Sequence, residues 1–411
     1  MPKQDFIAAL DLGTSKVTCF IGEILQKQNL SVIGRAWATH RGIKRGAIVD
    51  IDEVTQAIRK AVGEAENQAG LTIGQCFVSL SGDFISSINS RATVAIAHGG
   101  KEILDGDVRR VIDNARAVGI PTGREVIHVI PCGFIVDGHD GIRNPVGMSG
   151  LRLEVETHIV TGGTTYLQNI KKCLEGAELE VGPAGMVASS IASGLAVLHD
   201  DEKDLGTAVV DIGAGTSDLA IFRNGHIAHT AVLSVGGGHV TSDIQLALKL
   251  LPAEAERIKI EHGVAVPDMV RDDAFVDAMT LSDSETQQVS LHDIAEIIEL
   301  RLMDIFEWLK KEMDKAAKRG TRVAGVVLTG GTSLLQEVHT LGRQALELPV
   351  RVGRPETAWF PGAIRQPPFS SAAGLLMYGY ALSTHGTKEK KSASKVKNVL
   401  NRVVTVLEEL F

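Results

Sequence analysis

The sequence predicts an α/β protein with two lobes, each built around a tight β-hairpin whose turn is rich in small and hydroxyl residues. The first hairpin carries Asp11-Leu-Gly-Thr-Ser-Lys16, and the second carries Asp211-Ile-Gly-Ala-Gly-Thr-Ser-Asp218. A third apolar strand, over residues 323–329, ends in Gly330-Gly331. Because each hairpin continues into a second apolar strand, neither turn opens a helix as a Walker loop or a dinucleotide-binding loop does.

These turns have a composition that suits phosphate binding. Glycine lets backbone N–H groups approach an anion closely, and threonine and serine hydroxyls add donors. An aspartate does not bind phosphate, but it can hold a hydrated Mg²⁺ that does. One Asp-x-Gly turn between strands is usually only a turn, whereas two copies in matching context favour two phosphate clamps that face each other. At Gly330-Gly331 the backbone can lie against a flat base or ribose.

The other elements of the first half follow from hydrophobic periodicity. Lobe one is predicted to contain strands at 31–39 and 76–81, an amphipathic helix at 51–69, a helix at 165–177 and a Gly/Ala-rich stretch at 182–198. Between them, residues 84–161 read as a compact α+β unit, with strands at 92–97, 126–134 and 151–160 around a helix at 105–117.

In the second half, a polar run at 200–204 precedes the second hairpin, and Gly236-Gly237-Gly238 begins another unit that extends to about residue 310. A helical stretch within it places Glu256 and Lys259 one turn apart, where they can reach an adenosine or form an ordinary solvated pair. The last helix of this unit, 291–313, carries charged residues at positions predicted to be exposed: Glu296, Glu299, Arg301, Asp304 and Glu307. Such a face is usually only solvated.

The C-terminal end differs sharply from what precedes it. Residues 383–394 are polar and lysine-rich, as in a flexible linker, and residues 395–411 form an amphipathic helix pattern. Its apolar arc needs a bilayer interface, a partner groove or the chain's own domain to cover it. Nearby lysines favour anionic lipid. The apolar arc consists of Val396, Val399, Leu400, Val403, Val404, Val406, Leu407, Leu410 and Phe411.

Composition limits the function classes. The chain has 411 residues, enough for two sizeable cores, and its net charge of −8 argues against nucleic acid as the main partner. Its four cysteines are widely spaced, which indicates neither a zinc site nor a disulfide framework and favours a reduced, cytosolic compartment. The first strand begins almost at once, so no signal peptide is expected, and no apolar run is long enough to span a bilayer.

The chain resembles the actin-like ATPase superfamily in the order of its elements. The two hairpins come first, the helix with Glu256 and Lys259 follows, and the Gly-Gly strand comes last. Over essentially the full length the chain resembles the FtsA family of bacterial cell-division proteins. The most specific segments are Ala-Leu-Asp-Leu-Gly-Thr-Ser-Lys, Asp-Ile-Gly-Ala-Gly-Thr-Ser-Asp-Leu-Ala, Val240-Thr-Ser-Asp-Ile244 and Leu-Thr-Gly-Gly-Thr-Ser. The resemblance implies an actin-like two-lobed fold in which an α+β subdomain 1C replaces subdomain 1B of actin.

The resemblance also implies domain boundaries. Subdomain 1A would comprise residues 1–83, 162–199 and 363–383, and subdomain 1C residues 84–161. Subdomain 2A would comprise residues 205–235 and 314–362, and subdomain 2B residues 236–313. Residues 384–394 would form the linker and residues 395–411 the membrane-targeting helix.

Carried over by position, the resemblance implies an ATP and Mg²⁺ site. Phosphate clamp one would be Asp11, Gly13, Thr14, Ser15 and Lys16, and clamp two Asp211, Gly213, Gly215, Thr216 and Ser217. Adenosine would contact Glu256, Lys259, Gly330, Gly331 and Ser333. Asp11 and Asp211 would hold the metal through water. No residue is identified that positions a water for hydrolysis, so ATPase activity is expected to be weak at most.

The family resemblance implies a protein that polymerises and tethers FtsZ to the cytoplasmic face of the inner membrane at the division septum. The C-terminal peptide of FtsZ would bind near Glu299 and Arg301, the terminal helix would bind an anionic membrane surface, and later division proteins would be recruited. Two alternatives are a small-molecule kinase of the same superfamily and a scaffold like PilM of pilus assembly. Neither alternative explains the amphipathic tail.

Overall fold

The computed structural model describes residues 6–25, 29–96, 102–117, 119–280 and 286–385. Two five-stranded sheets with the same plan form its centre, and they define lobe one and lobe two. In each sheet an antiparallel hairpin continues into a third antiparallel strand on one side and two parallel strands on the other. The two hairpins predicted from sequence are therefore confirmed as strand–turn–strand units.

Lobe one has the strand order β11-β6-β1-β2-β3. Its strands are β1 (Phe6–Leu12), β2 (Lys16–Leu25), β3 (Asn29–Thr39), β6 (Gln75–Leu80) and β11 (Glu180–Ala188). Its helices are α1 (Ile51–Ala69), α3 (Thr164–Gly176), α4 (Ser189–Val197) and α10 (Ser370–His385). The helix predicted at 51–69 is confirmed: Asp50 caps its first turn by accepting from the Glu53 N–H, and Gly70 ends it in the left-handed region.

Lobe two has the strand order β14-β13-β12-β17-β18. Its strands are β12 (Thr207–Ile212), β13 (Ser217–Arg223), β14 (His226–Leu233), β17 (Gly325–Thr329) and β18 (Val350–Val352). The central strand β12 pairs antiparallel with β13 and parallel with β17. Because β12 and β17 run in the same direction, the second hairpin turn and Gly330-Gly331 lie at the same edge of the sheet.

Residues 85–163 form a four-stranded antiparallel sheet of order β7-β10-β8-β9, here called the inserted unit. Its strands are β7 (Ile85–Ala95), β8 (Arg124–Val136), β9 (His139–Ile142) and β10 (Arg152–Gly163). Helix α2 (Asp105–Arg116) packs on the sheet, and the unit has a hydrophobic core of its own. This is the α+β unit predicted from sequence, with longer strands.

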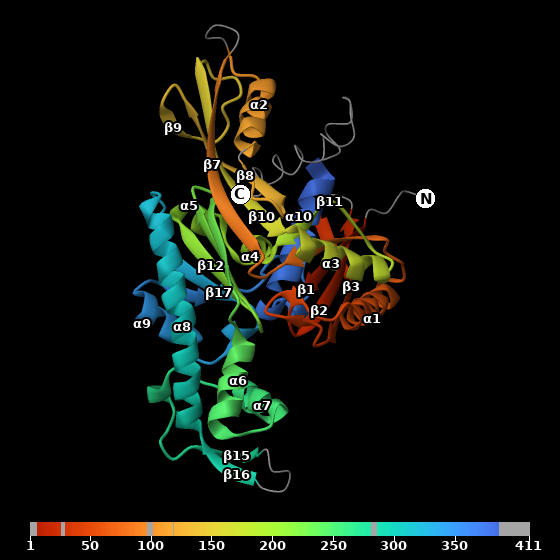
Figure 1. Ribbon diagram of the computed structural model, residues 1–411, viewed down its shortest axis with the longest axis vertical. Coiled ribbons are helices and arrows are strands. Elements are labelled where there is room, and N and C mark those ends of the chain that lie inside the picture. The colour runs from red at the N-terminus through yellow and green to blue at the C-terminus, as the bar shows by residue number, and fades with distance from the viewer. Residues whose placement is uncertain (1–5, 26–28, 97–101, 118, 281–285, 386–411) are drawn as a thin grey trace.

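The lower unit extends lobe two beyond the second hairpin, opposite the inserted unit (Figure 1). It comprises α6 (Gly237–Leu248), α7 (Pro252–His262), β15 (Phe275–Met279), β16 (Thr286–Ser290) and the long helix α8 (Leu291–Lys318). The sequence placed the end of α8 at residue 313, five residues too early. Buried Met313 and Ala316 continue its apolar face and explain the extra turn. The lower unit and lobe two share one hydrophobic core.

Short elements complete the described chain: β4 (Ile43–Lys44), β5 (Ala47–Ile48), α5 (Asp200–Leu205), α9 (Val338–Leu346) and the 3₁₀ turns Pro267–Met269, Gly331–Leu334, Gly362–Ile364 and Pro367–Phe369. In the described ranges no helix is long and apolar enough to cross a membrane. The amphipathic helix predicted at 395–411, including its apolar residues Val396 to Phe411, lies outside the described residues.

The inserted unit also touches lobe two, through a polar seam along β14. Ser87 Oγ donates to Thr230 O at 2.8 Å, and His158 contacts Asn89 Oδ1 at 2.7 Å and Thr230 Oγ1 at 2.9 Å. Cys132 Sγ lies 3.1 Å from Ile227 O. Since both ends of the inserted unit join lobe one, these contacts link it to both lobes.

Candidate functional site

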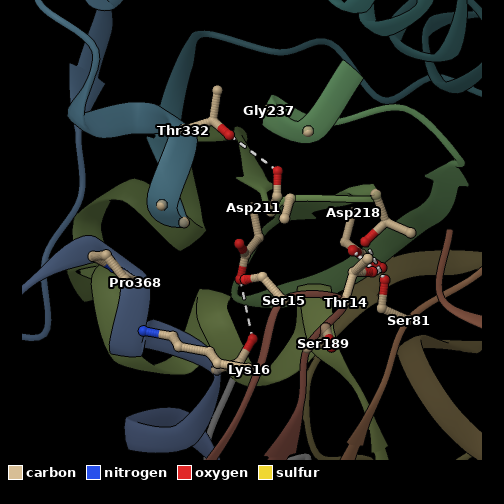
Figure 2. Close-up of a pocket in the computed structure, with 18 of the residues that line it drawn as sticks. Thr14, Ser15, Lys16, Ser81, Ser189, Asp211, Asp218, Gly237, Thr332 and Pro368 are labelled. Carbon is tan, nitrogen blue, oxygen red and sulfur yellow. Dashed lines mark hydrogen bonds between the residues drawn. The ribbon is translucent and has the colours of Figure 1, made fainter. Parts of the chain in front are cut away.

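A cavity of about 640 Å³ lies where the two hairpin turns face each other (Figure 2). Its lining comes from both lobes and from the lower unit. Twelve of the predicted site residues line it: Asp11, Gly13, Thr14, Ser15, Lys16, Asp211, Gly213, Thr216, Glu256, Lys259, Gly330 and Gly331. The structure therefore brings together segments that are far apart in sequence.

The two turns have matching geometry. The Gly13 N–H donates to Lys16 O at 3.1 Å, and the Gly213 N–H donates to Thr216 O at 2.8 Å. Gly215 does not line the cavity, but a Cβ there would lie 2.4 Å from Thr14 Oγ1 of the opposite turn. Glycine at 215 therefore allows the two turns to approach each other.

The run Gly236-Gly237-Gly238 packs beneath the second turn. The N–H groups of Gly237 and Gly238 donate to Gly213 O at 2.9 Å and to Ala214 O at 2.7 Å. A Cβ at any of the three positions would come within 2.8 Å of residues 213–214 or Thr332. Gly236 and Gly238 are needed because the first turn of α6 lies directly against the second hairpin turn, and Gly237 is needed because Thr332 lies against it.

The glycines after β17 have different roles. Gly330 has φ +84°, and a Cβ there would lie 2.3 Å from Asp211 Oδ1. Gly331 lines the cavity, and a Cβ there would meet no described atom within 4 Å. Besides Gly215, two predicted site residues do not line the cavity: Ser333 is buried and donates to Gly330 O at 2.8 Å, and buried Ser217 donates to Val235 O at 2.8 Å.

The two aspartates at the strand ends are held differently. Asp11 accepts a hydrogen bond from Ser79 Oγ at 2.5 Å, within lobe one. Asp211, on lobe two, accepts from Ser193 of α4 and from Ser371 of α10, the latter at 3.0 Å. Burial raises the pKa of Asp11, and it raises the pKa of Asp211 to about 6. Both carboxylates therefore lie where a bound cation would stabilise their charged form.

Lys16 brings an ammonium group to the cavity. In Figure 2 its side chain extends toward Pro368, and Nζ lies 4.3 Å from the centroid of the Phe369 ring. Burial lowers the pKa of Lys16, although Asp11 and Asp211 oppose this shift. An ammonium in this position favours an anionic ligand.

Glu256 and Lys259 form a fixed pair on the wall of the cavity. Lys259 Nζ donates to Gly237 O at 3.1 Å, to Thr241 Oγ1 at 2.8 Å and to Glu256 Oε2 at 2.7 Å. These contacts use all three N–H groups of the lysine, whose side chain is only 11% exposed. The pair is therefore not an ordinary solvated one, and Glu256 is the better placed of the two to contact a ligand.

Sequence reasoning missed several lining residues. Ile260, Leu334, Leu335 and Pro368 supply apolar surface, which no local pattern had marked. It also missed Ser81 and Asp218. Asp218 stands directly opposite Asp211 across the second hairpin, at the position that Thr18 occupies in the first. The first hairpin has a hydroxyl residue at this position and the second has a carboxylate, and this difference could have marked Asp218 as a site residue.

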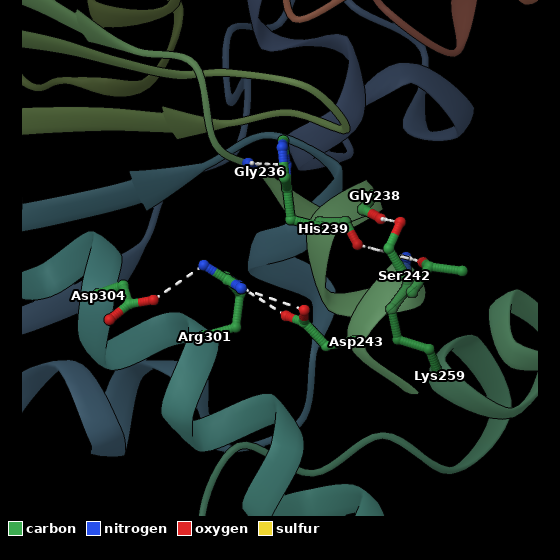
Figure 3. Close-up of polar contacts among 10 residues, drawn as sticks. Gly236, Gly238, His239, Ser242, Asp243, Lys259, Arg301 and Asp304 are labelled. Atoms are coloured by element: carbon green, nitrogen blue, oxygen red, sulfur yellow. Dashed lines mark hydrogen bonds and ion pairs between the residues drawn. The ribbon is translucent and has the colours of Figure 1, made fainter. Parts of the chain in front are cut away.

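Arg301, predicted to be exposed for a partner, is engaged within the chain (Figure 3). Nε and Nη2 donate to Asp243 of α6 at 2.7 and 3.1 Å, and Nη1 donates to Asp304 at 2.9 Å. Its side chain is 28% exposed, and Glu299 is also partly buried, so the predicted exposure of both was wrong. The apolar neighbour Leu300 is 69% exposed instead.

Comparisons with known proteins agree on one family. The family model "Cell division protein FtsA" matches residues 208–374, and the model "SHS2 domain inserted in FTSA" matches residues 82–161. The chain is 37% identical to the cell division protein FtsA of Pseudomonas aeruginosa, over 94% of this chain and 92% of that protein. It is 31% identical to that of Escherichia coli K12, over 99% of each.

Solved structures show the same fold at low sequence identity. A chain of the PilM-PilN type IV pilus biogenesis complex has a TM-score of 0.63 and 17% identity, covering 91% of this chain and 98% of its own. MreB5 of Spiroplasma citri bound to ADP has a TM-score of 0.55 and 12% identity, covering 94% and 99%. The predicted actin-like fold with an inserted α+β unit is thereby confirmed.

Proposed function

The chain belongs to the FtsA family of cell-division proteins, and on that premise we propose that it binds Mg-ATP between its lobes and links FtsZ to the membrane during division. In this proposal it polymerises, lies on the cytoplasmic side of the inner membrane at the septum, and recruits later division proteins. The observation that carries the ATP proposal is the cavity in which both hairpin turns, Lys16 and the open side of Gly331 meet.

The chemistry of the cavity fits a nucleotide with a metal ion. Turn N–H groups and hydroxyls suit phosphates, and Lys16 adds positive charge. Burial raises the pKa values of Asp11 and Asp211 despite their hydrogen bonds and the charge of Lys16, and a hydrated Mg²⁺ beside them would stabilise their charged forms. When bound, the ion would neutralise phosphate charge. A neighbour of the same fold, MreB5, is described as bound to ADP, which supports a nucleotide here.

We also propose the subdomain division given above, with subdomain 1A at 1–83, 162–199 and 363–383, 1C at 84–161, 2A at 205–235 and 314–362, and 2B at 236–313. Supporting it, the inserted unit and the lower unit each extend from one of the two five-stranded sheets. The terminal helix 395–411 remains a proposal from sequence, with Val396, Val399, Leu400, Val403, Leu407, Leu410 and Phe411 as its membrane face.

For the FtsZ C-terminal peptide we propose the surface of α8 around Glu299–Arg301. Exposed Leu300 offers an apolar contact at this surface. Arg301 is already bound to Asp243 and Asp304, so a charge contact with an acidic peptide would have to compete with those carboxylates. Its main contribution would then be to hold α8 against α6.

Sedimentation with anionic liposomes tests the membrane link. The full chain with ATP should pellet with the vesicles and carry FtsZ peptide with it, whereas a chain ending at residue 394 should stay in the supernatant with unchanged ATP affinity. The double variant Leu407→Glu/Phe411→Glu should behave like the truncated chain, because burying several apolar side chains at about 1.5–3 kcal/mol each drives the binding. Pelleting of the double variant would refute a lipid-binding tail.

A further inference from the structure

The proposed ATP site leaves one buried carboxylate without a role. Asp218 lies on β13, lines the cavity and is 3% exposed. Its Oδ2 accepts a hydrogen bond from Ser81 Oγ at 2.6 Å, but no described residue hydrogen-bonds its Oδ1. A buried polar atom without a partner costs about 1–3 kcal/mol, so its presence beside a cavity indicates a ligand or a reacting group.

Asp218 lies at the phosphate end of the cavity. In Figure 2, Asp218, Ser81 and Thr14 of the first turn lie together at one end, whereas Pro368 lies at the other and Thr332, next to the Gly-Gly segment, lies apart. Thr216 of the second turn also belongs to this group, with Oγ1 2.7 Å from Ser81 Oγ. Asp218 therefore lies beside Thr14, Thr216 and Ser81, and the first two belong to the turns proposed to hold phosphates.

We propose that Asp218 is a catalytic residue that orients the attacking water and accepts its proton when bound ATP is hydrolysed, and that Ser81 is its positioning residue. The inference rests on the proposed ATP binding. In this step the water oxygen bonds to the terminal phosphorus while the bond from that phosphorus to the bridging oxygen breaks. The electron pair goes to the ADP leaving group, and the water proton goes to Oδ1, which gives ADP and inorganic phosphate.

The position of Ser81 makes this arrangement depend on both lobes. Ser81 follows β6 of lobe one, and Asp218 belongs to lobe two, so their hydrogen bond crosses the cleft. When the lobes are close, as here, Ser81 holds Oδ2 and fixes the direction of Oδ1. Separation of the lobes removes that donor, so hydrolysis should occur only in the closed arrangement.

In the ligand-free chain, burial raises the pKa of Asp218 to about 8, and the hydrogen bond from Ser81 opposes the shift.

The test uses the full chain and two readouts: Mg-ATP affinity by calorimetry and single-turnover hydrolysis with radiolabelled ATP. Asp218→Asn keeps the shape of the side chain and should lower the hydrolysis rate about 100-fold or more, with ATP affinity within about threefold of wild type. Glu312→Gln is the matched control, because it neutralises another buried carboxylate, on α8 of the lower unit and outside the cavity. The control should hydrolyse ATP like wild type.

Ser81 gives an independent arm, which also covers the case in which Asp218→Asn does not fold. Ser81→Ala should slow hydrolysis about tenfold without weakening ATP binding, and Ser81→Thr, which keeps the hydroxyl, should restore the rate. A merely structural serine would lower affinity and rate together. The proposal is overturned if Asp218→Asn or Ser81→Ala hydrolyses at the wild-type rate, or if wild type binds ATP without hydrolysing it. Failure of wild type to bind ATP would instead refute the proposed function.

Discussion

Substitution of Gly331 by valine should block nucleotide binding while leaving the fold intact. A side chain at this position would meet no described protein atom within 4 Å, and the backbone is not in the left-handed region, so valine adds no strain. Its methyl groups would instead enter the cavity where the base or ribose is proposed to lie. Inserting such a group into a filled site costs about 1–3 kcal/mol.

That cost corresponds to a Kd for Mg-ATP that is about 5- to 150-fold weaker, measurable by isothermal titration calorimetry. The matched control is Gly74→Val, because Gly74 also has open space and no positive φ but does not line the cavity. Both variants should unfold at the wild-type temperature, and the control should bind ATP normally. Wild-type affinity in Gly331→Val would refute the placement of the nucleoside at the Gly-Gly segment.

Three further predictions follow from contacts and burial. Arg301→Glu should place a carboxylate beside Asp243 and Asp304 and lower the melting temperature by about 2–4 °C, measured by scanning calorimetry. The exchanged pair Asp243→Arg/Arg301→Asp should recover part of that loss. If Arg301→Glu melts at the wild-type temperature, the ion pair contributes nothing to stability. His158→Ala should leave Asn89 and Thr230 of the seam without a hydrogen-bond partner, which costs about 1–3 kcal/mol of stability. Thiol labelling of Cys132, measured by mass spectrometry with buried Cys19 as the internal control, should then be faster. Unchanged labelling would mean that the seam does not hold the inserted unit. Because the pKa of Asp218 is raised to about 8, this carboxyl binds a proton more tightly in the folded chain than in the unfolded chain. The contribution of Asp218 to stability is therefore present at low pH and is lost as the pH rises toward 8 and above. Melting curves of the ligand-free chain should show this loss and Asp218→Asn should reduce it, whereas identical pH profiles of the two proteins would contradict the raised pKa.

Local sequence was sufficient to predict the two hairpins, the Gly-Gly strand and helix α1, because each has its signal within a few residues. Asp50 caps the start of α1 and Gly70 ends it, and short continuous apolar runs mark the strands that lead to Asp11 and Asp211. Repetition of the turn pattern was also enough to predict that the two hairpins share one site.

The rest depended on packing that sequence does not display. Arg301 looked exposed because helix periodicity describes one helix, whereas its partner Asp243 comes from another, 58 residues earlier. Likewise, the need for Gly236 and Gly238 arises from the backbone of residues 213–214 lying against them, and the need for Gly237 arises from the side chain of Thr332. Ser81 and Asp218 were missed because their role requires two strands from different lobes to meet.

A crystal structure of the chain with Mg²⁺ and a non-hydrolysable ATP analogue tests the central claim most directly. It should show one nucleotide in the cleft, with its phosphates between the Gly13–Lys16 and Gly213–Thr216 turns and its base against Gly331. Such a structure should also show whether a water lies beside Asp218. A nucleotide bound elsewhere, or an empty cavity at saturating analogue, would contradict the account.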